Sequence, residues 1–558
     1  MEQHDAGAQR SVRRGPSLSA GEHEYIQQRK VVSAQALRNL GLNCTKDEMP
    51  HVALLTSGGG ERAAVALIGS LTQMSRDGLL DPVLYLSGVS GSTWSMASLY
   101  RDPQWSRSLN SLLPTPHSVE PEKILSWLYD KAQSPEFSLS DPWGALISAA
   151  IMKTWDNWTL SEEAARNASN PYPVYGAVEQ FCFNEGPTQG KWFELTPHEA
   201  GFSELELFVE TSALGSKFQG GALLEDTDES EQLQSLQQRE QQFLQWTYEL
   251  GTVIQTWVNS LPEGPTKAQV GFLVDKIISL VVRWEWGTVK NFLYKYDEVP
   301  VPSCLASAEL LHLVDAGLLM NTAYPSFLGP RRDIDLIIAP EYSAGEMFET
   351  LTLARAYAAE VGKPFPQLDD TVLKEEKLWP KDCYVFEGND TAPTIVYMPL
   401  FNRRNCKDAD EWAQRMKEFA TFQRSYSPEM IDRLLKIAQE NMKNNKETVL
   451  REITKALERR RNKTHSAQVQ PDQPDQPDQP TVPPGLKRKT MEHPPAPAST
   501  RQHPSSPRQP PSAPVPSTCP LSYRSNPPRR TEGQLQRERE LRASPVLRFY
   551  NVMEMQQK

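Results

Sequence analysis

The chain has 558 residues, which is enough for one large domain with a substantial core or for several ordinary domains. Its formal net charge is −11, but residues 464–558 carry 13 Lys and Arg against 8 Asp and Glu, so the rest of the chain stands at −16. Nucleic acids are polyanions, so this acidic body argues against nucleic acid as the main partner.

The apolar runs of the sequence indicate the cellular compartment of the protein. The first residues, MEQHDAGAQRSVRRG, have no apolar core of the kind that a signal peptide needs. No later run reaches the roughly 18 to 20 apolar residues that span a membrane. We therefore expect a cytoplasmic protein that is not secreted.

The cysteines lie far apart, and no two of them form a CxxC pair. They are Cys44, Cys182, Cys304, Cys383, Cys406 and Cys519. Cytosolic cysteines usually remain thiols, and a structural zinc site needs closer spacing. We therefore expect reduced thiols, no disulfide and no bound metal.

The body of the chain alternates between strand and helix patterns. Residues 1–47 form a polar arm in which KVVSAQALRNLGL has the apolar spacing of a short helix. HVALLTSGGG then predicts a buried strand ending in three glycines, and ERAAVALIGSLTQMSRDGLL predicts a helix. VLYLSG and STWSMASLY repeat this order. The alternation indicates an α/β fold that binds ligands at the carboxyl ends of its strands.

The middle of the chain has weaker patterns. Residues 105–170 are rich in Trp and predict helices that either cap the sheet or contact lipid directly. Residues 173–222 contain short strand-like segments, and residues 224–250 are acidic and rich in Gln, which indicates an exposed insertion. LLHLVDAGLL, RDIDLIIAP and TIVYMPLF predict further strands, and SAGEMFETLTLARAYAAEV predicts a helix.

The C-terminal part changes composition twice. Residues 426–463 form a charged helical region, and residues 464–558 form a disordered tail, because PDQPDQPDQP and its sequel lack the apolar residues of a core. Two stretches of the tail, RQHPSSP and RQPPSAP, fit the basic-x-x-Pro-x-x-Pro ligands of SH3-type domains. Such matches arise easily in a proline-rich tail, so a tail without partners is the alternative.

A serine lies in the turn between the second strand and its helix, in the sequence Gly88-Val89-Ser90-Gly91-Ser92. A hydrolase nucleophile needs an exposed oxygen on a fixed backbone, and a sharp turn flanked by glycines provides both. The helix after Ser90 directs its N-terminal dipole toward developing negative charge. Because Ser92 replaces the common Gly, a plain turn of small residues is the alternative.

Three glycines, Gly58, Gly59 and Gly60, follow the first strand and open a helix. Their N–H groups can bind an anion without obstruction from side chains. The stretch lacks the Lys-Ser/Thr of a P-loop and the spacing of a dinucleotide fingerprint. Since Ser90 is expected after the neighbouring strand, an oxyanion hole and a phosphate-binding turn are both open.

A general base for Ser90 has few candidates. The candidate histidines are His51, His117, His198 and His312. His312 and Asp315 lie in one predicted strand, where side chains alternate, so only one of them can point to Ser90. Asp315 stands at the end of that strand, where active-site groups collect, although a turn Asp has the same position.

The motifs SGGGERA, GVSGSTW and VDAG, in this order, resemble those of the cytosolic phospholipase A2 (group IV) family, which is related to patatin-like lipases. WFELTPHEAGF, GSKF, WEWGTVKNFLYK and SAGEMFET are similar to further family segments. The resemblance implies a phospholipase catalytic domain over residues 48–425, with a central, mostly parallel sheet, helices and a cap. The arm 1–47, the charged helical region 426–463 and the tail 464–558 lie outside it.

The resemblance also implies a mechanism without a histidine or a cofactor. Ser90 would be the nucleophile and Asp315 the base, and the Gly59 and Gly60 N–H groups would hold the oxyanion. Arg62 would bind the substrate phosphate, with a helix-surface cation as its alternative. The implied activity is hydrolysis of phospholipids and lysophospholipids, and acyl transfer to a second lysolipid is open to the same intermediate.

Two features depart from the family pattern. Glu61 stands where the family usually has an apolar or aromatic residue, and it could pair with Arg62 or point to solvent. About 47 residues precede the first core strand, too few for the calcium-binding sandwich of many members, so calcium dependence is not expected. NVMEMQQK has no CaaX box, so prenyl anchoring is not expected. We expect peripheral association with intracellular membranes, either through the apolar and aromatic surface of the cap or as a transient contact. A weakly active or inactive homologue that binds partners through its tail is the alternative function.

Overall fold

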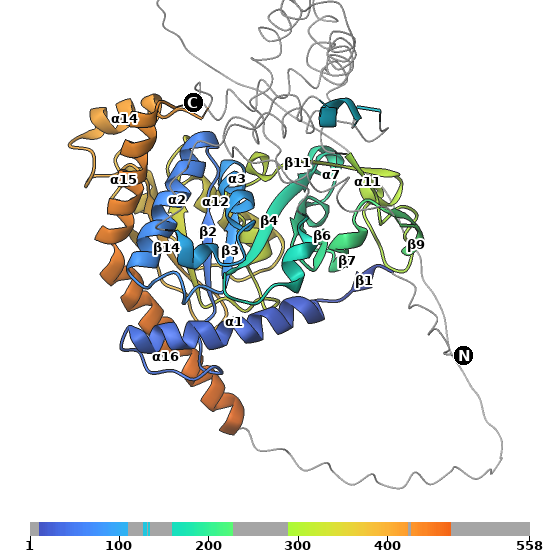
Figure 1. Cartoon of the computed structure of the whole chain (residues 1–558), viewed down its shortest axis with the longest axis horizontal. Helices are drawn as coiled ribbons and strands as arrows, with labels where there is room; N and C mark the ends of the chain where they lie inside the picture. The colour runs from blue at the N-terminus through green and yellow to red at the C-terminus, as the bar shows by residue number, and fades with distance from the viewer. Residues whose placement is uncertain are drawn as a thin grey trace, which may run out of the picture. The chain divides into compact units, whose positions relative to one another are not determined.

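The computed structural model describes residues 11–109, 126–130, 132–133, 159–226, 288–421 and 426–469. The chain divides into two units, residues 1–469 and 470–558, and only the first contains described residues. Figure 1 shows helices around a central sheet in this unit. Residues 464–469, predicted as the start of the disordered tail, are instead the last residues of a helix that ends at Val469. The rest of the tail with its SH3-type motifs, residues 227–250 of the predicted insertion and most of the Trp-rich stretch 105–170 lie outside the described residues.

The centre of the sheet is parallel. Its strands lie in the order β4-β3-β2-β12-β14, and each pairs in parallel with the next. Every residue of β2, β3, β12 and β14 is buried, which explains why their sequences are nearly continuous apolar runs. The predicted α/β fold with a mostly parallel central sheet is therefore confirmed. The bounds are β2 (Val52–Thr56), β3 (Tyr85–Gly88), β4 (Tyr172–Glu179), β12 (Leu336–Glu341) and β14 (Thr394–Pro399).

Antiparallel strands extend this centre. Beyond β4 the order continues through β5, β6 and β7 to β1, and β13 pairs with β14 at the other end. β11 lies antiparallel to both β4 and β10, and β8 and β9 form a separate pair. The bounds are β1 (Arg13–Arg14), β5 (Trp192–Leu195), β6 (Glu199–Phe202), β7 (Leu207–Glu210), β8 (Lys217–Gln219), β9 (Ala222–Glu225), β10 (Thr288–Lys290), β11 (Leu310–Asp315) and β13 (Tyr384–Phe386).

Helices follow the parallel strands as predicted. α2 (Gly60–Arg76) follows β2, α3 (Gly91–Leu99) follows β3, and α12 (Glu349–Glu360) follows β12. Figure 1 shows α15 (Pro428–Asn444) beside α2 at one side of the sheet. A Cβ atom on Gly69 would lie 2.7 Å from the carbonyl oxygen of Leu435, so a glycine permits this close approach. Among the described residues, further α-helices with defined bounds are α1 (Ala20–Asn39), α4 (Trp105–Ser108), α7 (Gln180–Glu185), α11 (Ser303–Ala306), α13 (Asp370–Glu375), α14 (Ala409–Glu418) and α16 (Lys446–Val469).

Cys182 and Cys304 form a disulfide, so the prediction that all cysteines are reduced is wrong. Cys182 lies in α7, directly after β4, and Cys304 lies in α11, shortly before β11. Because β4 and β11 pair antiparallel, these two helices lie at the same end of the strand pair, and the Cα atoms are 5.4 Å apart. The sequence separation of 122 residues hides this proximity. Cys44, Cys383 and Cys406 are free, and Cys519 lies outside the described residues.

In the described ranges, no helix has both the length and the apolar composition needed to cross a membrane.

Candidate active site

Ser90 sits in a strained turn between β3 and α3. Its φ of 54° and ψ of −129° are unusual for a residue other than glycine, and a conformation of this kind costs about 1–3 kcal/mol. Ser90 is the N-cap residue of α3, but its side chain makes no capping hydrogen bond. The turn therefore leaves the hydroxyl group available for other contacts, as the nucleophile turn of a hydrolase requires.

The turn that carries Ser90 packs directly on the glycine turn before α2. A Cβ atom on Gly91 would lie 2.0 Å from the carbonyl oxygen of Gly60, so no larger residue fits there. The Ser92 hydroxyl donates a hydrogen bond to the carbonyl oxygen of Ser57 at 2.7 Å. Ser92, the departure from the common pentapeptide, thus joins the two turns.

The glycine turn presents two adjacent N–H groups. Gly59 has a φ of 149° and Gly60 a φ of 59°, values that favour glycine. Gly59 is the N-cap residue of α2 and Gly60 is its first residue, so their N–H groups have no acceptor within the helix. The N-termini of α2 and α3 meet here, and both helix dipoles favour negative charge.

Two strand ends converge along one edge of β4. β3 runs parallel to β4 and ends with Gly88 opposite Tyr175, whereas β11 runs antiparallel and ends with Asp315 opposite Ala177. The two carboxyl ends therefore face each other. This arrangement brings the Ser90 side chain, just after β3, close enough to the Asp315 carboxylate for its hydroxyl to stabilise the ionised carboxyl group.

The Asp315 carboxyl group is a stronger base than an ordinary Asp. The residue as a whole is only half-buried, but its carboxyl group lies deep, and this burial raises its pKa to about 6. A hydrogen bond from the Gly317 N–H, at 2.7 Å, and the nearby Ser90 hydroxyl both oppose this increase in the pKa. At neutral pH the group is therefore ionised and can accept a proton from Ser90.

The structure gives the candidate histidines other contacts. The ring of His312 meets the Phe181 ring edge-on, with centroids 5.0 Å apart, and its Nδ1 lies 3.3 Å from Thr288 Oγ1. His117 lies outside the described residues. The remaining two bond within the fold, His51 to the carbonyl of Arg332 and His198 to the hydroxyl of Tyr172.

Arg62 is buried next to the glycine turn. Its Nη2 lies 2.7 Å from the position of a Cβ atom on Gly59. Nε donates to the carbonyl of Tyr342 at 2.6 Å, and the guanidinium also donates to the carbonyl of Phe419 and, at 3.1 Å, to Thr421 Oγ1. Arg62 is fully buried, so a phosphate can reach this guanidinium only if the residues that cover it rearrange.

Glu61 contacts the segment that precedes α15. Its Oε2 accepts a hydrogen bond from the backbone N–H of Tyr426 at 2.9 Å, and burial raises the pKa of its carboxyl group. Glu61 and Arg62 thus both bind residues between α14 and α15. Figure 1 shows α14 and the start of α15 at the upper left of the described residues.

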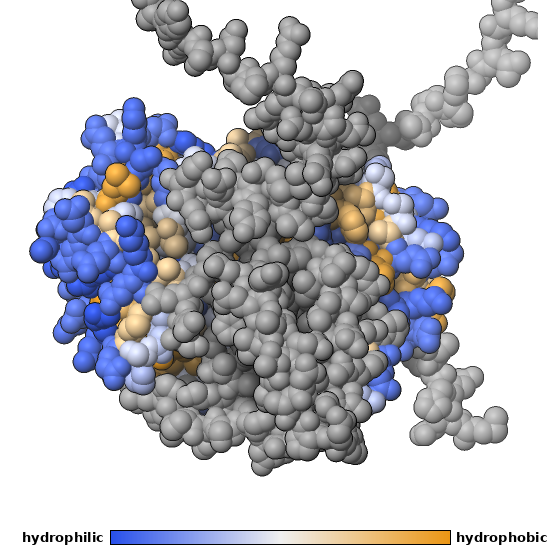
Figure 2. Space-filling model, turned by 90° about the horizontal axis from the view of Figure 1, so that it is seen from above, coloured by the Kyte–Doolittle hydropathy of each residue, from blue (hydrophilic) through white to orange (hydrophobic). Residues whose placement is uncertain are grey.

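The upper face is seen in Figure 2. The described residues at its outer rim are hydrophilic, and hydrophobic residues lie further in on both sides.

Asn321 was not predicted as a site residue from the sequence. It lies six residues after Asp315, beyond the short 3-10 helix Ala316–Leu318. Its side-chain amide exchanges hydrogen bonds with the backbone of Gly58. The only local signal is an amide within the otherwise apolar stretch GLLMNTAYP.

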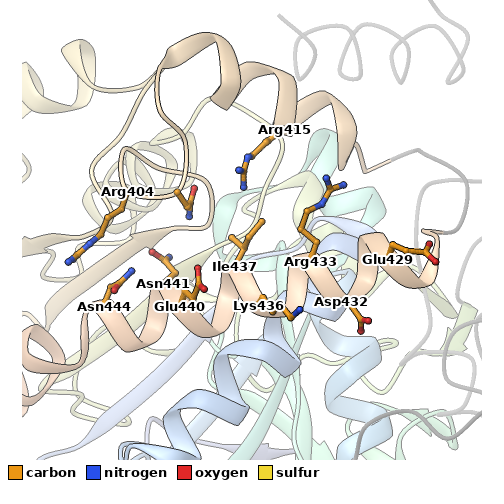
Figure 3. A pocket seen from close by; sticks show the side chains of 11 residues that line it. Arg404, Arg415, Glu429, Asp432, Arg433, Lys436, Ile437, Glu440, Asn441 and Asn444 are labelled. Atoms are coloured by element: carbon orange, nitrogen blue, oxygen red, sulfur yellow. The ribbon is translucent and has the colours of Figure 1, made fainter.

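A cavity of about 540 Å³ lies elsewhere, between α15 and the segment around α14 (Figure 3). Its described lining residues do not include the site residues predicted from the sequence. Most are charged, and three arginines of the lining form ion pairs: Arg404 with Asp382, Arg415 with Glu411, and Arg433 with Glu418. Because the protein itself neutralises these cations, we assign no ligand to the cavity.

Comparison with known proteins identifies the class of enzyme. A family model described as "Lysophospholipase catalytic domain" matches residues 52–236, the part that contains both turns and β4. Human cytosolic phospholipase A2 gamma is 30% identical over 518 residues, which cover 78% of this chain and 95% of that protein. The mouse gamma protein is 28% identical over 550 residues, covering 78% and 91%.

Solved structures agree. Human GIVD cytosolic phospholipase A2 matches with a TM-score of 0.64 and 25% identity, covering 81% of this chain and 69% of that one. The same human protein in complex with methyl gamma-linolenyl fluorophosphonate matches with a TM-score of 0.60 and 26% identity, covering 81% and 66%. The chain belongs to the cytosolic phospholipase A2 family and carries its phospholipase catalytic domain. The family resemblance predicted from the motifs is confirmed, and the chain matches the human and mouse gamma proteins over nearly their whole length.

Proposed function

We propose that the chain hydrolyses the fatty acyl esters of glycerophospholipids and lysophospholipids through a dyad of Ser90 and Asp315. The observation that carries the proposal is the approach of these two side chains at converging strand ends. The raised pKa of Asp315 supports its role as the base.

In the first half of the reaction, Ser90 Oγ attacks the ester carbonyl carbon while its proton passes to the Asp315 carboxylate. The N–H groups of Gly59 and Gly60, with the N-termini of α2 and α3, stabilise the negative charge that develops on the carbonyl oxygen. The tetrahedral intermediate then collapses, and Asp315 returns the proton to the departing glycerol oxygen. The products are an acyl-serine and a lysolipid.

In the second half, Asp315 takes a proton from water, whose oxygen attacks the acyl-serine. The fatty acid leaves, and the proton returns to Ser90 Oγ. A second lysolipid can replace water as the acceptor, which gives transacylation. Because these steps use only protein groups and water, we propose that turnover needs neither calcium nor another cofactor.

We propose Arg62 as the group that binds the substrate phosphate, with its position beside Gly59 as support. Its bonds to Tyr342, Phe419 and Thr421 would have to be partly exchanged for phosphate oxygens. The relatives are named cytosolic, which supports a protein that meets membrane surfaces transiently from the cytosol.

The activity can be tested on a phospholipid with different acyl chains at its two positions. Mass spectrometry of the products should detect a free fatty acid with the wild-type chain, with and without a calcium chelator, and none with Ser90→Ala. The identity of the released chain gives the positional preference. Equal release by the wild type and Ser90→Ala would refute the proposed dyad.

A further inference from the structure

Asn321 pairs with one glycine through both its backbone and its side chain. The Gly58 N–H is shared between the backbone carbonyl oxygen of Asn321, at 3.1 Å, and its side-chain Oδ1, at 3.2 Å. In return Asn321 Nδ2 donates to the Gly58 carbonyl oxygen at 3.3 Å. Asn321 therefore bonds to both polar groups of the Gly58 backbone, and the Gly58 carbonyl oxygen also accepts a longer bond from Ser57 Oγ, at 3.4 Å.

The same amide lies beside both members of the dyad. A Cβ atom on Gly58 would lie 2.4 Å from Asn321 Oδ1 and 2.6 Å from Ser90 Cβ, so Gly58 is held between these two side chains. A Cβ atom on Gly317 would lie 3.1 Å from Asn321 Oδ1 and 3.1 Å from Asp315 Oδ1. The amide of Asn321 thus connects the turn that bears Asp315 with the glycine turn.

This pairing determines which N–H groups of the glycine turn remain as donors for an oxyanion. The Gly58 N–H is already engaged, so the turn presents the next two donors, Gly59 and Gly60. Their direction depends on the orientation of the Gly58 peptide groups, which Asn321 fixes from both sides. A donor that is misplaced by about 1 Å can cost about 100-fold in rate.

We propose that Asn321 is a positioning residue, which fixes the glycine turn relative to Ser90 and Asp315 so that the Gly59 and Gly60 N–H groups meet the developing oxyanion. This inference rests on the proposed function. An amide suits the task because it donates and accepts at once. Aspartate has the same shape but cannot donate to the Gly58 carbonyl, and it adds a negative charge near Asp315 and the oxyanion.

The test compares Asn321→Ala and the isosteric Asn321→Asp with the wild type on a lysophospholipid. For Asn321→Ala we expect kcat to fall about 100-fold with KM nearly unchanged, because the interaction acts on the transition state. The rate of Ser90 labelling by a fluorophosphonate should fall in parallel. For Asn321→Asp we expect a similar loss, together with an upward shift of about one unit in the midpoint of the pH–rate profile.

Asn170→Ala is the matched control. Asn170 is buried, and like Asn321 its side-chain amide bonds to backbone groups, in this case the carbonyl of Pro103 and the N–H of Ser106. Asn170 directly precedes β4, at the end of the strand that lies away from Asp315. It should lower the melting temperature but leave kcat of the folded enzyme within about threefold.

Two results would overturn the proposal. One is a kcat for folded Asn321→Ala within about threefold of the wild type. The other is a pH–rate midpoint for Asn321→Asp that equals that of the wild type. If Asn321→Ala does not fold, the pH–rate midpoint of the isosteric Asn321→Asp still tests the proposal. If the wild type itself shows no turnover that depends on Ser90, the proposed function fails, and that outcome is distinguishable from failure of Asn321 alone.

Discussion

The Ser90 hydroxyl lies beside the Asp315 carboxylate, although β3, which precedes Ser90, and β11, which ends at Asp315, run in opposite directions along β4. Gly88 and Asp315 pair with residues only two positions apart on β4. The proposed dyad therefore depends on the register of two strands against a third, and it requires neither a flexible loop nor a histidine.

Activity should increase with pH through about 6. Asp315 must be ionised to accept the Ser90 proton, and burial raises its pKa to about 6. A plot of log kcat/KM against pH should therefore rise with a slope near one below this value and level off above it. His312→Ala should leave the midpoint unchanged. A midpoint near 4, or one that moves in the histidine variant, would contradict this role of Asp315.

Replacing Asp315 with Asn should remove activity and stabilise the protein at pH 7. The pKa is about 6 in the folded state against 3.8 for a free Asp, so the folded state binds more protons between these values. The free energy of unfolding therefore decreases as pH rises from about 4 to 6, and the Asp315 contribution stays unfavourable above 6. The neutral Asn side chain has no such unfavourable contribution, so we expect the free energy of unfolding of Asp315→Asn to exceed that of the wild type by about 1–3 kcal/mol at pH 7.

Denaturant titrations of both proteins at pH 4 and pH 7 measure this effect. The difference between them should be small at pH 4, where both side chains are neutral in the folded state. If Asp315→Asn is less stable than the wild type at pH 7, burial of the ionised Asp315 carboxyl group does not destabilise the folded state.

Glu61→Leu should change turnover on a lysophospholipid and on a monoacylglycerol by the same factor. Glu61 accepts the Tyr426 N–H, so its loss leaves that donor unsatisfied, at a cost of about 1–3 kcal/mol in stability. Glu61→Gln is the matched control, because its amide oxygen can still accept. Competition between Glu61 and the substrate phosphate for Arg62 would instead raise kcat/KM on the phosphate-bearing lipid alone.

The Cys182–Cys304 disulfide should stabilise the folded chain. A bond that closes so long a loop contributes about 2–5 kcal/mol, so a dithiol reductant should lower the melting temperature by several degrees. Cys304→Ala should melt at the lower temperature and no longer respond to the reductant, whereas Cys406→Ala, at a free cysteine, should still respond. Non-reduced digests that contain separate Cys182 and Cys304 peptides would disprove the bond.

The local parts of the site could be predicted from the sequence. The turn at Ser90 and the glycine turn are each a few consecutive residues between a buried strand and a helix, so their small residues and flanking apolar runs indicate the geometry. Asp315 was identified as a candidate because it ends a strand, although a turn Asp looked the same.

The contacts between distant segments could not be predicted. The pairing of Asn321 with Gly58 and the disulfide of Cys182 depend on the register of β11 against β4, and no local pattern encodes that register. The partner of Glu61 was also hidden, because Tyr426 lies far away in sequence and meets it only through the packing of α15 on α2.

Labelling with a fluorophosphonate tests the central claim most directly, because such a probe reacts at a useful rate only with an activated serine. After incubation of the full-length chain, mass spectrometry of a digest should find the adduct on Ser90 alone. Asp315→Asn should keep the fold but lose most of the labelling rate, and Ser90→Ala should lose all of it. An adduct that persists in Ser90→Ala, or an unchanged labelling rate in Asp315→Asn, would contradict the Ser90–Asp315 dyad.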